Sequence, residues 1–190
     1  SAINDNDREE YFEKIFANII KVLVSICICI ISVDFILFHY IFDIKYLEGM
    51  KYVPILITAC IFTVVSQFFG GIFIGLKEPK YNGGTTVISA IINVVVHLAL
   101  VKFVGLYAAA ISTLVAFAFL CIVRYCIIKK RFAIKIKKDT TVFIAIYIYF
   151  IIMHHIDYMP INIINIIVVS WIFLYVNKEY AIKFIRKVRQ

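Results

Sequence analysis

Long apolar runs dominate the chain, and short polar segments separate them. A helix of about 20 apolar residues, rising 1.5 Å per residue, crosses the hydrocarbon core of a bilayer, which is about 30 Å thick. The pattern predicts six such spans, at about 19–42, 52–76, 85–101, 105–128, 140–158 and 161–176. The last two are the weakest, because the apolar part of the sixth reaches only about 24 Å. The predicted fold is an all-α, polytopic membrane helix bundle with six spans.

Both ends of the chain show amphipathic patterns. Residues 1–18 form a polar, acidic lead-in that turns apolar at helical spacing as it approaches the first span. Residues 177–190 alternate basic and apolar positions. This pattern is typical of a helix lying on an anionic cytoplasmic leaflet, although a solvated basic tail is equally compatible with it. Membrane lipids are therefore expected partners.

Composition excludes an ordinary soluble domain. Apolar residues make up 63% of the chain and charged residues 17%, against about 45–50% and about 25% in globular proteins. All five cysteines lie inside apolar runs, where thiols behave as small hydrophobic groups. Their spacing implies neither disulfides nor a zinc site, and the sequence predicts no metal and no cofactor.

The net charge of +8 is an orientation signal. With the N-terminus inside, only Lys45, Lys51 and Lys102 of the 20 basic residues fall outside, which leaves 17 on the cytoplasmic side. This bias predicts that both termini are cytoplasmic. Because the basic residues follow membrane sidedness and form no separate face, we expect no nucleic-acid partner.

Two charged residues lie within the first predicted span. Asp34, toward its outer half, is interpreted as a cavity-lining residue, as a protonated or paired structural carboxyl, or as the sign of a misplaced span boundary. Lys21, in the inner half, either snorkels to the interface or binds an anionic headgroup. About 20 Å of helix separates the two, so they cannot pair with each other.

Further polar groups lie in later spans. Asn93 and His97 share one face of the third span, where they either hydrogen-bond to another helix or line a polar pathway. His154 and His155 superficially resemble an acyltransferase site, but the spacing to Asp157 is wrong for one, and an interfacial cap is the preferred interpretation. Gly70, Gly71 and Gly75 lie on or near one face of the second span, with a small-xxx-small register from Gly71 to Gly75, which predicts a close helix-packing surface.

The stretch from Tyr46 to Phe132 resembles part of a known family. Residues 46–56, Tyr-Leu-Glu-Gly-Met-Lys-Tyr-Val-Pro-Ile-Leu, look like the entry to a late helix in polysaccharide repeat-unit flippases. Residues 104–113 resemble the helix start of these proteins, Gly-x-x-Gly-Ala-Ala-Ile-x-Thr, with Ala108 in place of the second glycine. These Wzx-type exporters belong to the multidrug/oligosaccharidyl-lipid/polysaccharide exporter superfamily.

This resemblance implies a fold, a substrate and a set of site residues. The family has two six-helix lobes around a cavity, so the chain is expected to be the C-terminal portion, with the N-terminal lobe as its missing partner. The expected function is not enzymatic: it is the movement of undecaprenyl-diphosphate-linked oligosaccharide across the cell (inner) membrane by alternating access. The candidate substrate-binding residues are Lys21, Asp34, Asn93, His97 and Arg124.

Three alternatives stay open at this stage. A cation-coupled drug antiporter of the same superfamily would bind Na⁺ or H⁺ at Asp34. A membrane-embedded acyltransferase would use His154 or His155. The third alternative is a structural membrane subunit. The sequence contains no nucleophile elbow, glycine-rich phosphate loop or pair of carboxylates at catalytic spacing, so no such motif supports an enzyme.

Overall fold

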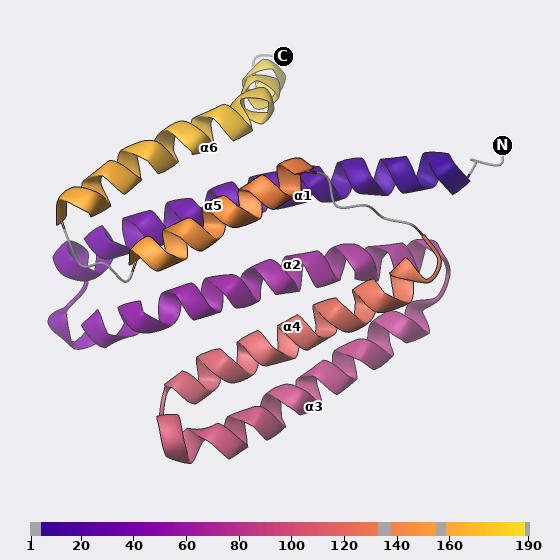
Figure 1. The fold of residues 1–190 in the computed structure, drawn as a ribbon, viewed down its shortest axis with the longest axis horizontal. Helices are drawn as coiled ribbons and strands as arrows, with labels where there is room; N and C mark the ends of the chain where they lie inside the picture. Colours follow the sequence, from indigo (N-terminus) through magenta and orange to yellow (C-terminus); the bar gives the residue numbers. More distant parts are fainter. Residues whose placement is uncertain (1–4, 133–137, 155–158, 189–190) are drawn as a thin grey trace. The chain divides into compact units, whose positions relative to one another are not determined.

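The described part of the chain is entirely helical apart from its connections. A computed structural model describes residues 5–132, 138–154 and 159–188. The elements, in chain order, are α1 (Asp5–Ile36), the π-helix η1 (Leu37–Ile41), the 3₁₀-helix η2 (Ile44–Tyr52), α2 (Val53–Gly75), α3 (Pro79–Val104), α4 (Tyr107–Lys129), α5 (Lys138–His154) and α6 (Met159–Val188) (Figure 1). The predicted all-α fold is confirmed, and no strand occurs within these residues.

Five of the helical segments are long and apolar enough to cross a membrane. They are Arg8–Ile41, Ile44–Gly75, Pro79–Val104, Tyr107–Lys129 and Pro160–Lys178. A sixth apolar helix, Thr140–His154, is shorter and covers only about 22 Å. The end of the predicted fifth span, residues 155–158, lies outside the described residues. The chain is therefore a polytopic membrane helix bundle, with five long apolar helices and one short one among the residues that the structure describes.

Backbone chemistry explains where the middle helices begin and end. Pro54 and Pro79 occupy the first turns of α2 and α3, where the missing N–H costs no hydrogen bond. Lys77, in the connection between these two helices, has a positive φ of 60°. Gly105 ends α3 with φ 55° and ψ −128°, the values of the first central residue of a type II′ turn. Each sharp reversal thus depends on one residue in an unusual backbone conformation.

The chain divides into two compact units. The first comprises residues 1–13 and 51–135, which contain α2, α3 and α4. Here α4 lies between α2 and α3 and packs on both (Figure 1). The buried Phe69 ring on α2 meets the Tyr125 ring on α4 at a centroid distance of 5.8 Å. On the other side, the Ser89 hydroxyl of α3 donates to the carbonyl oxygen of Ala116 at 2.8 Å. Small residues on α3 and α4 thus permit a close helix contact.

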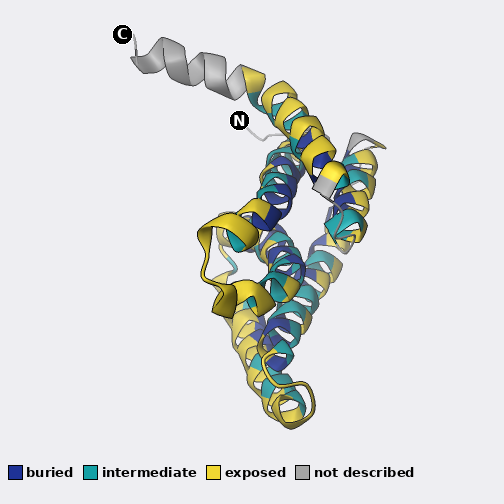
Figure 2. Ribbon diagram, turned by 90° about the vertical axis from the view of Figure 1, so that its left-hand side faces the viewer, coloured by how far each residue is buried: buried dark blue, intermediate teal, exposed yellow. Residues whose placement is uncertain are grey.

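Helix α3 leaves most of its apolar surface uncovered. Thr85 and Ser89 are its only buried residues, whereas valine and isoleucine side chains such as Val87, Ile91 and Val95 are more than half exposed. Figure 2 shows how exposed positions alternate with buried ones along the helices. Apolar side chains on the surface of an apolar helix suit contact with lipid tails, because the tails are themselves apolar and offer no hydrogen bonds.

The second unit comprises residues 14–50 and 136–190. It contains most of α1, the η1 and η2 segments, α5 and α6. Val24, Ile28, Phe150 and Val169 are almost fully buried. A hydrogen bond of 3.1 Å from the side-chain amide of Asn177 to the Ser25 hydroxyl joins α6 to α1. This unit therefore has its own apolar core, with polar ties inside it.

Candidate functional site

Arg124 is the most deeply buried charged residue among those described. It lies on α4 and is 1% exposed. Its guanidinium donates four hydrogen bonds, to Thr85 Oγ1 (3.0 Å), the Ser66 carbonyl (2.9 Å), the Asn82 carbonyl (3.0 Å) and Thr86 Oγ1 (2.8 Å). All four acceptors are neutral oxygens, so the cation is stabilised by oriented dipoles from α2 and α3. Arg124 therefore ties three helices together.

Gly70 provides the space for this guanidinium. A Cβ atom at Gly70 would lie 2.6 Å from Asn82 Oδ1 and 2.8 Å from Arg124 Nη1, both too close for unbonded atoms. At Gly71 and Gly75, in contrast, a Cβ atom would meet nothing within 4 Å. Of the predicted packing face of Gly70, Gly71 and Gly75, only Gly70 is closely approached within the described residues. The close approach occurs there because the large Arg124 side chain must fit beside it.

A second ionisable group, Asp34 on α1, pairs with His154 at the end of α5. His154 Nε2 lies 3.1 Å from Asp34 Oδ2, and the two side chains are 7% and 4% exposed. Of the three interpretations of Asp34, the structure shows the paired carboxyl. The interpretation of His154 as an interfacial cap stays a prediction, and the structure adds that its ring is buried against the carboxylate. Since 120 residues separate the partners, no local pattern indicates this pair.

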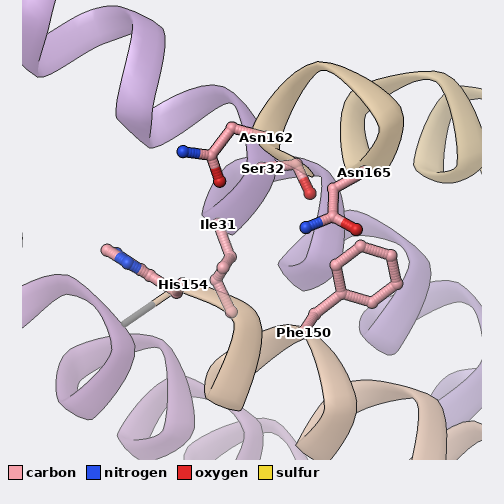
Figure 3. Close-up of a pocket in the computed structure, with 6 residues that line it drawn as sticks. All are labelled: Ile31, Ser32, Phe150, His154, Asn162 and Asn165. Carbon is pink, nitrogen blue, oxygen red and sulfur yellow. The ribbon is translucent and has the colours of Figure 1, made fainter. Parts of the chain in front are cut away.

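A small polar pocket lies next to this pair in the same unit. The described residues that line it are Ile31, Ser32, Phe150, His154, Asn162 and Asn165 (Figure 3). The space in it that a water-sized molecule can occupy is about 10 Å³, which is room for about one water molecule. In Figure 3 the Ser32 side chain lies between the carboxamides of Asn162 and Asn165. The pocket gathers polar groups from α1, α5 and α6.

The five candidate residues from the sequence are divided between the two units. Lys21 and Asp34 belong to the second unit, whereas Asn93, His97 and Arg124 belong to the first. Asn93 and His97 are partly buried on α3 and make no hydrogen bond to the described residues. Asn93 lies about 10 Å along the helix axis from the nearest acceptor of Arg124 on α3. Substrate binding by these five residues stays a prediction, and His155 lies outside the described residues.

An ion pair joins the chain beyond α4 to the connection between α2 and α3. Arg131 contacts the carboxylate of Glu78, and its guanidinium carbon lies 5.6 Å from the ring centroid of Tyr81. The hydrogen bond with Glu78 raises the pKa of the Arg131 guanidinium above its usual value. Arg131 is therefore charged at any physiological pH.

The polar partners of these groups were not predicted from the sequence. The acceptors of Arg124 are hydroxyl and carbonyl oxygens, which carry no charge signal in a sequence. One usable signal was present: Asn162 and Asn165 are three residues apart in the sixth span, so both lie on one helix face. Within the described residues, no group of three His, Cys, Asp or Glu side chains is placed to hold a metal ion.

Comparison with known protein families shows to which family the chain belongs. A family model described as "Polysaccharide biosynthesis protein" matches residues 2–180. The chain belongs to this polysaccharide biosynthesis protein family. Comparison with curated proteins and with solved structures yields no significant match. Membership supports the resemblance to the polysaccharide exporter superfamily.

Membership in the polysaccharide biosynthesis protein family also bears on the alternatives. Proteins of this family are typically transporters or flippases, not enzymes. Together with the five long apolar helices, the match indicates a multi-pass membrane protein with a role in polysaccharide production. A transporter is therefore favoured over the acyltransferase hypothesis for His154.

Proposed function

We propose that the chain is part of an exporter that moves undecaprenyl-diphosphate-linked oligosaccharide repeat units across the cell (inner) membrane. The observation that carries this proposal is the match of the polysaccharide biosynthesis family over residues 2–180 of a chain with long apolar helices. A protein of a polysaccharide biosynthesis family that is embedded in the membrane is suited to handle a saccharide attached to a lipid.

The physical difficulty of this task explains the need for polar groups inside the helices. A sugar headgroup in hydrocarbon loses its hydrogen bonds to water, at a cost of several kcal/mol for each unsatisfied group. A protein that offers replacement hydrogen bonds in an internal cavity removes most of this cost. The buried Asp34–His154 pair and the neighbouring polar pocket are compatible with such a path.

In this proposal the chain forms one lobe, and a second lobe completes the cavity. Asn93 and His97 on α3 would face the cavity and bind sugar hydroxyls, because both are polar, partly buried and without a hydrogen bond to the described residues. Lys21 would contact the anionic diphosphate. Arg124 would position α2 and α3 without binding the substrate, since its guanidinium already donates hydrogen bonds to four protein oxygens.

Genetic complementation tests the proposal. The complete gene that encodes this chain should restore surface polysaccharide to bacterial strains that lack their own repeat-unit flippase. The measurement is the amount of polymer on the cell surface, with a vector carrying an unrelated transporter as control. Failure in several strains with different repeat units, despite normal membrane insertion, would reject the proposed substrate.

One observation favours a second candidate, a cation-coupled antiporter of the same superfamily. Asp34 and His154 form a buried pair in which both groups can take up a proton. For this alternative, addition of a cationic drug to vesicles that contain the protein should drive proton or sodium flux. Asp34→Asn should abolish that flux, and complementation of the flippase-deficient strains should fail.

A further inference from the structure

The Ser32 hydroxyl on α1 is buried and has no hydrogen-bond partner among the described residues. A serine in a helix can donate to the carbonyl oxygen three or four residues earlier in the same helix. Ser25, Ser66 and Ser112 donate in this way, at 2.8 to 3.1 Å. Ser32 makes no such bond. Because a buried hydroxyl without a partner is costly, Ser32 indicates a ligand that supplies the partner.

The size of the pocket that Ser32 lines restricts this ligand. A water-sized molecule can occupy about 10 Å³ of the pocket. A cavity needs roughly 10–15 Å³ of such space to hold one water molecule. A sugar ring, a phosphate group or a lipid tail is much larger than this. The pocket therefore suits a single water molecule.

The polarity of the lining also suits a buried water. Such a water makes about two to four hydrogen bonds, whereas cavities with a purely apolar lining stay dry. The carboxamides of Asn162 and Asn165 line the pocket with Ser32, which lies between them in Figure 3. Each carboxamide can both donate and accept. Since no direct hydrogen bond joins Ser32 to either carboxamide, a water molecule is the group that can connect them.

We propose that the pocket binds one water molecule, which hydrogen-bonds to Ser32 of α1 and to the carboxamides of Asn162 and Asn165 of α6. A direct contact between the same helices occurs elsewhere, where the Asn177 amide donates to the Ser25 hydroxyl at 3.1 Å. Ser25 and Ser32 are seven residues apart, about two helical turns, so they lie near one face of α1. Helices α1 and α6 are thus joined by one direct and one water-mediated contact.

The water also lies beside the Asp34–His154 pair, because the His154 ring lines the same pocket. The three helices α1, α5 and α6 therefore meet around one solvent molecule. This inference goes beyond the proposed function and does not depend on which substrate the exporter moves.

The sign of one stability change tests the proposal. Ser32→Ala is made in the complete protein, and the folding equilibrium constant is measured by unfolding in detergent micelles. If the hydroxyl bonds to water, its loss should lower this constant about threefold to tenfold relative to the Ser170→Ala control. Ser170 is exposed on α6 and its hydroxyl bonds only within its own helix, so the control corrects for the helix preference of alanine.

The opposite sign would overturn the inference. If the Ser32 hydroxyl has no partner at all, Ser32→Ala removes a buried, unsatisfied polar group. The folding constant should then stay the same or rise relative to Ser170→Ala. Both variants replace one serine by the smaller alanine, so both should fold.

A double-mutant cycle tests the bridge to α6. Ser32→Ala should be coupled to Asn162→Ala and to Asn165→Ala by about threefold to tenfold in the folding constant, although no direct hydrogen bond joins these side chains. The positive control is Ser25→Ala with Asn177→Ala, since these two side chains bond directly. Independent effects of Ser32 and both carboxamides would contradict the bridge.

A structure of the complete protein in lipid nanodiscs, at a resolution that shows ordered water, gives the direct observation. Density for one water should appear within about 3.2 Å of Ser32 Oγ. A pocket without such density would overturn the inference. The exporter proposal is tested separately by complementation, and it stands or fails independently of this water.

Discussion

Arg124 and Asp34 show two ways of keeping an ionisable side chain inside apolar helices. Arg124 has four neutral oxygens around its guanidinium, whereas Asp34 has one imidazole beside its carboxylate. In the first arrangement several dipoles of fixed direction together stabilise the positive charge, so each contact contributes only part of the stabilisation. Replacement of a single partner of Arg124 therefore measures the contribution of one hydrogen bond.

Thr85→Val tests the contact with Nε of Arg124. The change keeps the side-chain shape but removes the oxygen that accepts this hydrogen bond at 3.0 Å. Because hydrogen bonds to charged groups contribute about 1.5–3 kcal/mol, we expect a loss of about 2 kcal/mol in the free energy of unfolding in detergent micelles. Thr113→Val is the matched control, since the Thr113 hydroxyl bonds only within its own helix.

A double-mutant cycle with Arg124→Met gives the decisive result. If the Thr85 hydroxyl acts through the guanidinium, Thr85→Val should cost much less in the Arg124→Met background than in the wild type. Equal costs in both backgrounds would show that the hydrogen bond to Arg124 does not contribute.

Gly70→Ala tests the close approach of α2 to the guanidinium. The added methyl group would lie 2.6 Å from Asn82 Oδ1, so neighbouring atoms must move, and we expect a loss of about 1–3 kcal/mol in the free energy of unfolding. Gly71→Ala is the control, because its methyl group meets nothing within 4 Å, and alanine favours the helix by about 0.5–1 kcal/mol. A Gly70→Ala protein as stable as Gly71→Ala would contradict the structure.

At this scale the sequence predicts which groups are unusual but not what they contact. Asp34 and Arg124 stand out because an ionisable residue inside an apolar run is costly. Their partners are 38 to 120 residues away. Hydroxyl and carbonyl oxygens, moreover, occur in every helix of the chain. Helix packing selects among them, and packing depends on side-chain fit that one sequence does not reveal.

Among the elements, the two sharp connections of the first unit differ in how well their residues suit the backbone. Gly105 has φ 55° and ψ −128°, a region open almost only to glycine. Lys77 has φ 60° with a side chain present. The second arrangement is strained, since a side-chain-bearing residue loses roughly 1–2 kcal/mol in left-handed backbone.

Exchanges at these two positions should have opposite effects. Gly105→Ala should lower the free energy of unfolding by about 1–2 kcal/mol, because alanine cannot adopt this conformation without strain. Lys77→Gly should leave it unchanged or raise it by up to about 1 kcal/mol. Thermal unfolding in micelles measures both. A destabilised Lys77→Gly protein would mean that the lysine side chain itself stabilises the turn.

Helix extents differ from the predicted spans for a physical reason. Hydropathy predicts the part of a helix that lies in hydrocarbon, whereas backbone hydrogen bonds continue into polar sequence. Helix α3 therefore begins at Pro79, ahead of the apolar stretch predicted from about Thr85, and α1 includes the polar lead-in from Asp5. The apolar runs of the sequence predict the helices, and the helix ends depend on caps and turns such as the one at Gly105.

For the whole molecule, the distribution of basic residues predicts the orientation. Because 17 of the 20 lysines and arginines fall on one side of the predicted spans, both termini should be cytoplasmic. Alkaline phosphatase fused after Gln190 should be inactive, whereas green fluorescent protein at the same position should fluoresce. Phosphatase inserted after Glu48, in the exposed η2 segment, should be at least tenfold more active. Activity at Gln190 would contradict this orientation.

The neutral surroundings of Arg124 also have a consequence for biogenesis. An arginine in a helix that enters lipid alone carries a penalty that reaches about 2.5–3.5 kcal/mol at the helix centre. Arg124 lies five residues before the end of α4, so α4 carries part of that penalty. Ser66, Asn82, Thr85 and Thr86 precede Arg124 in the chain, so the ribosome delivers all four acceptors before α4 emerges. Helix α4 can therefore leave the translocon against α2 and α3, with its charge already hydrogen-bonded. The residues that accept hydrogen bonds from Arg124 are thus synthesised before Arg124 itself.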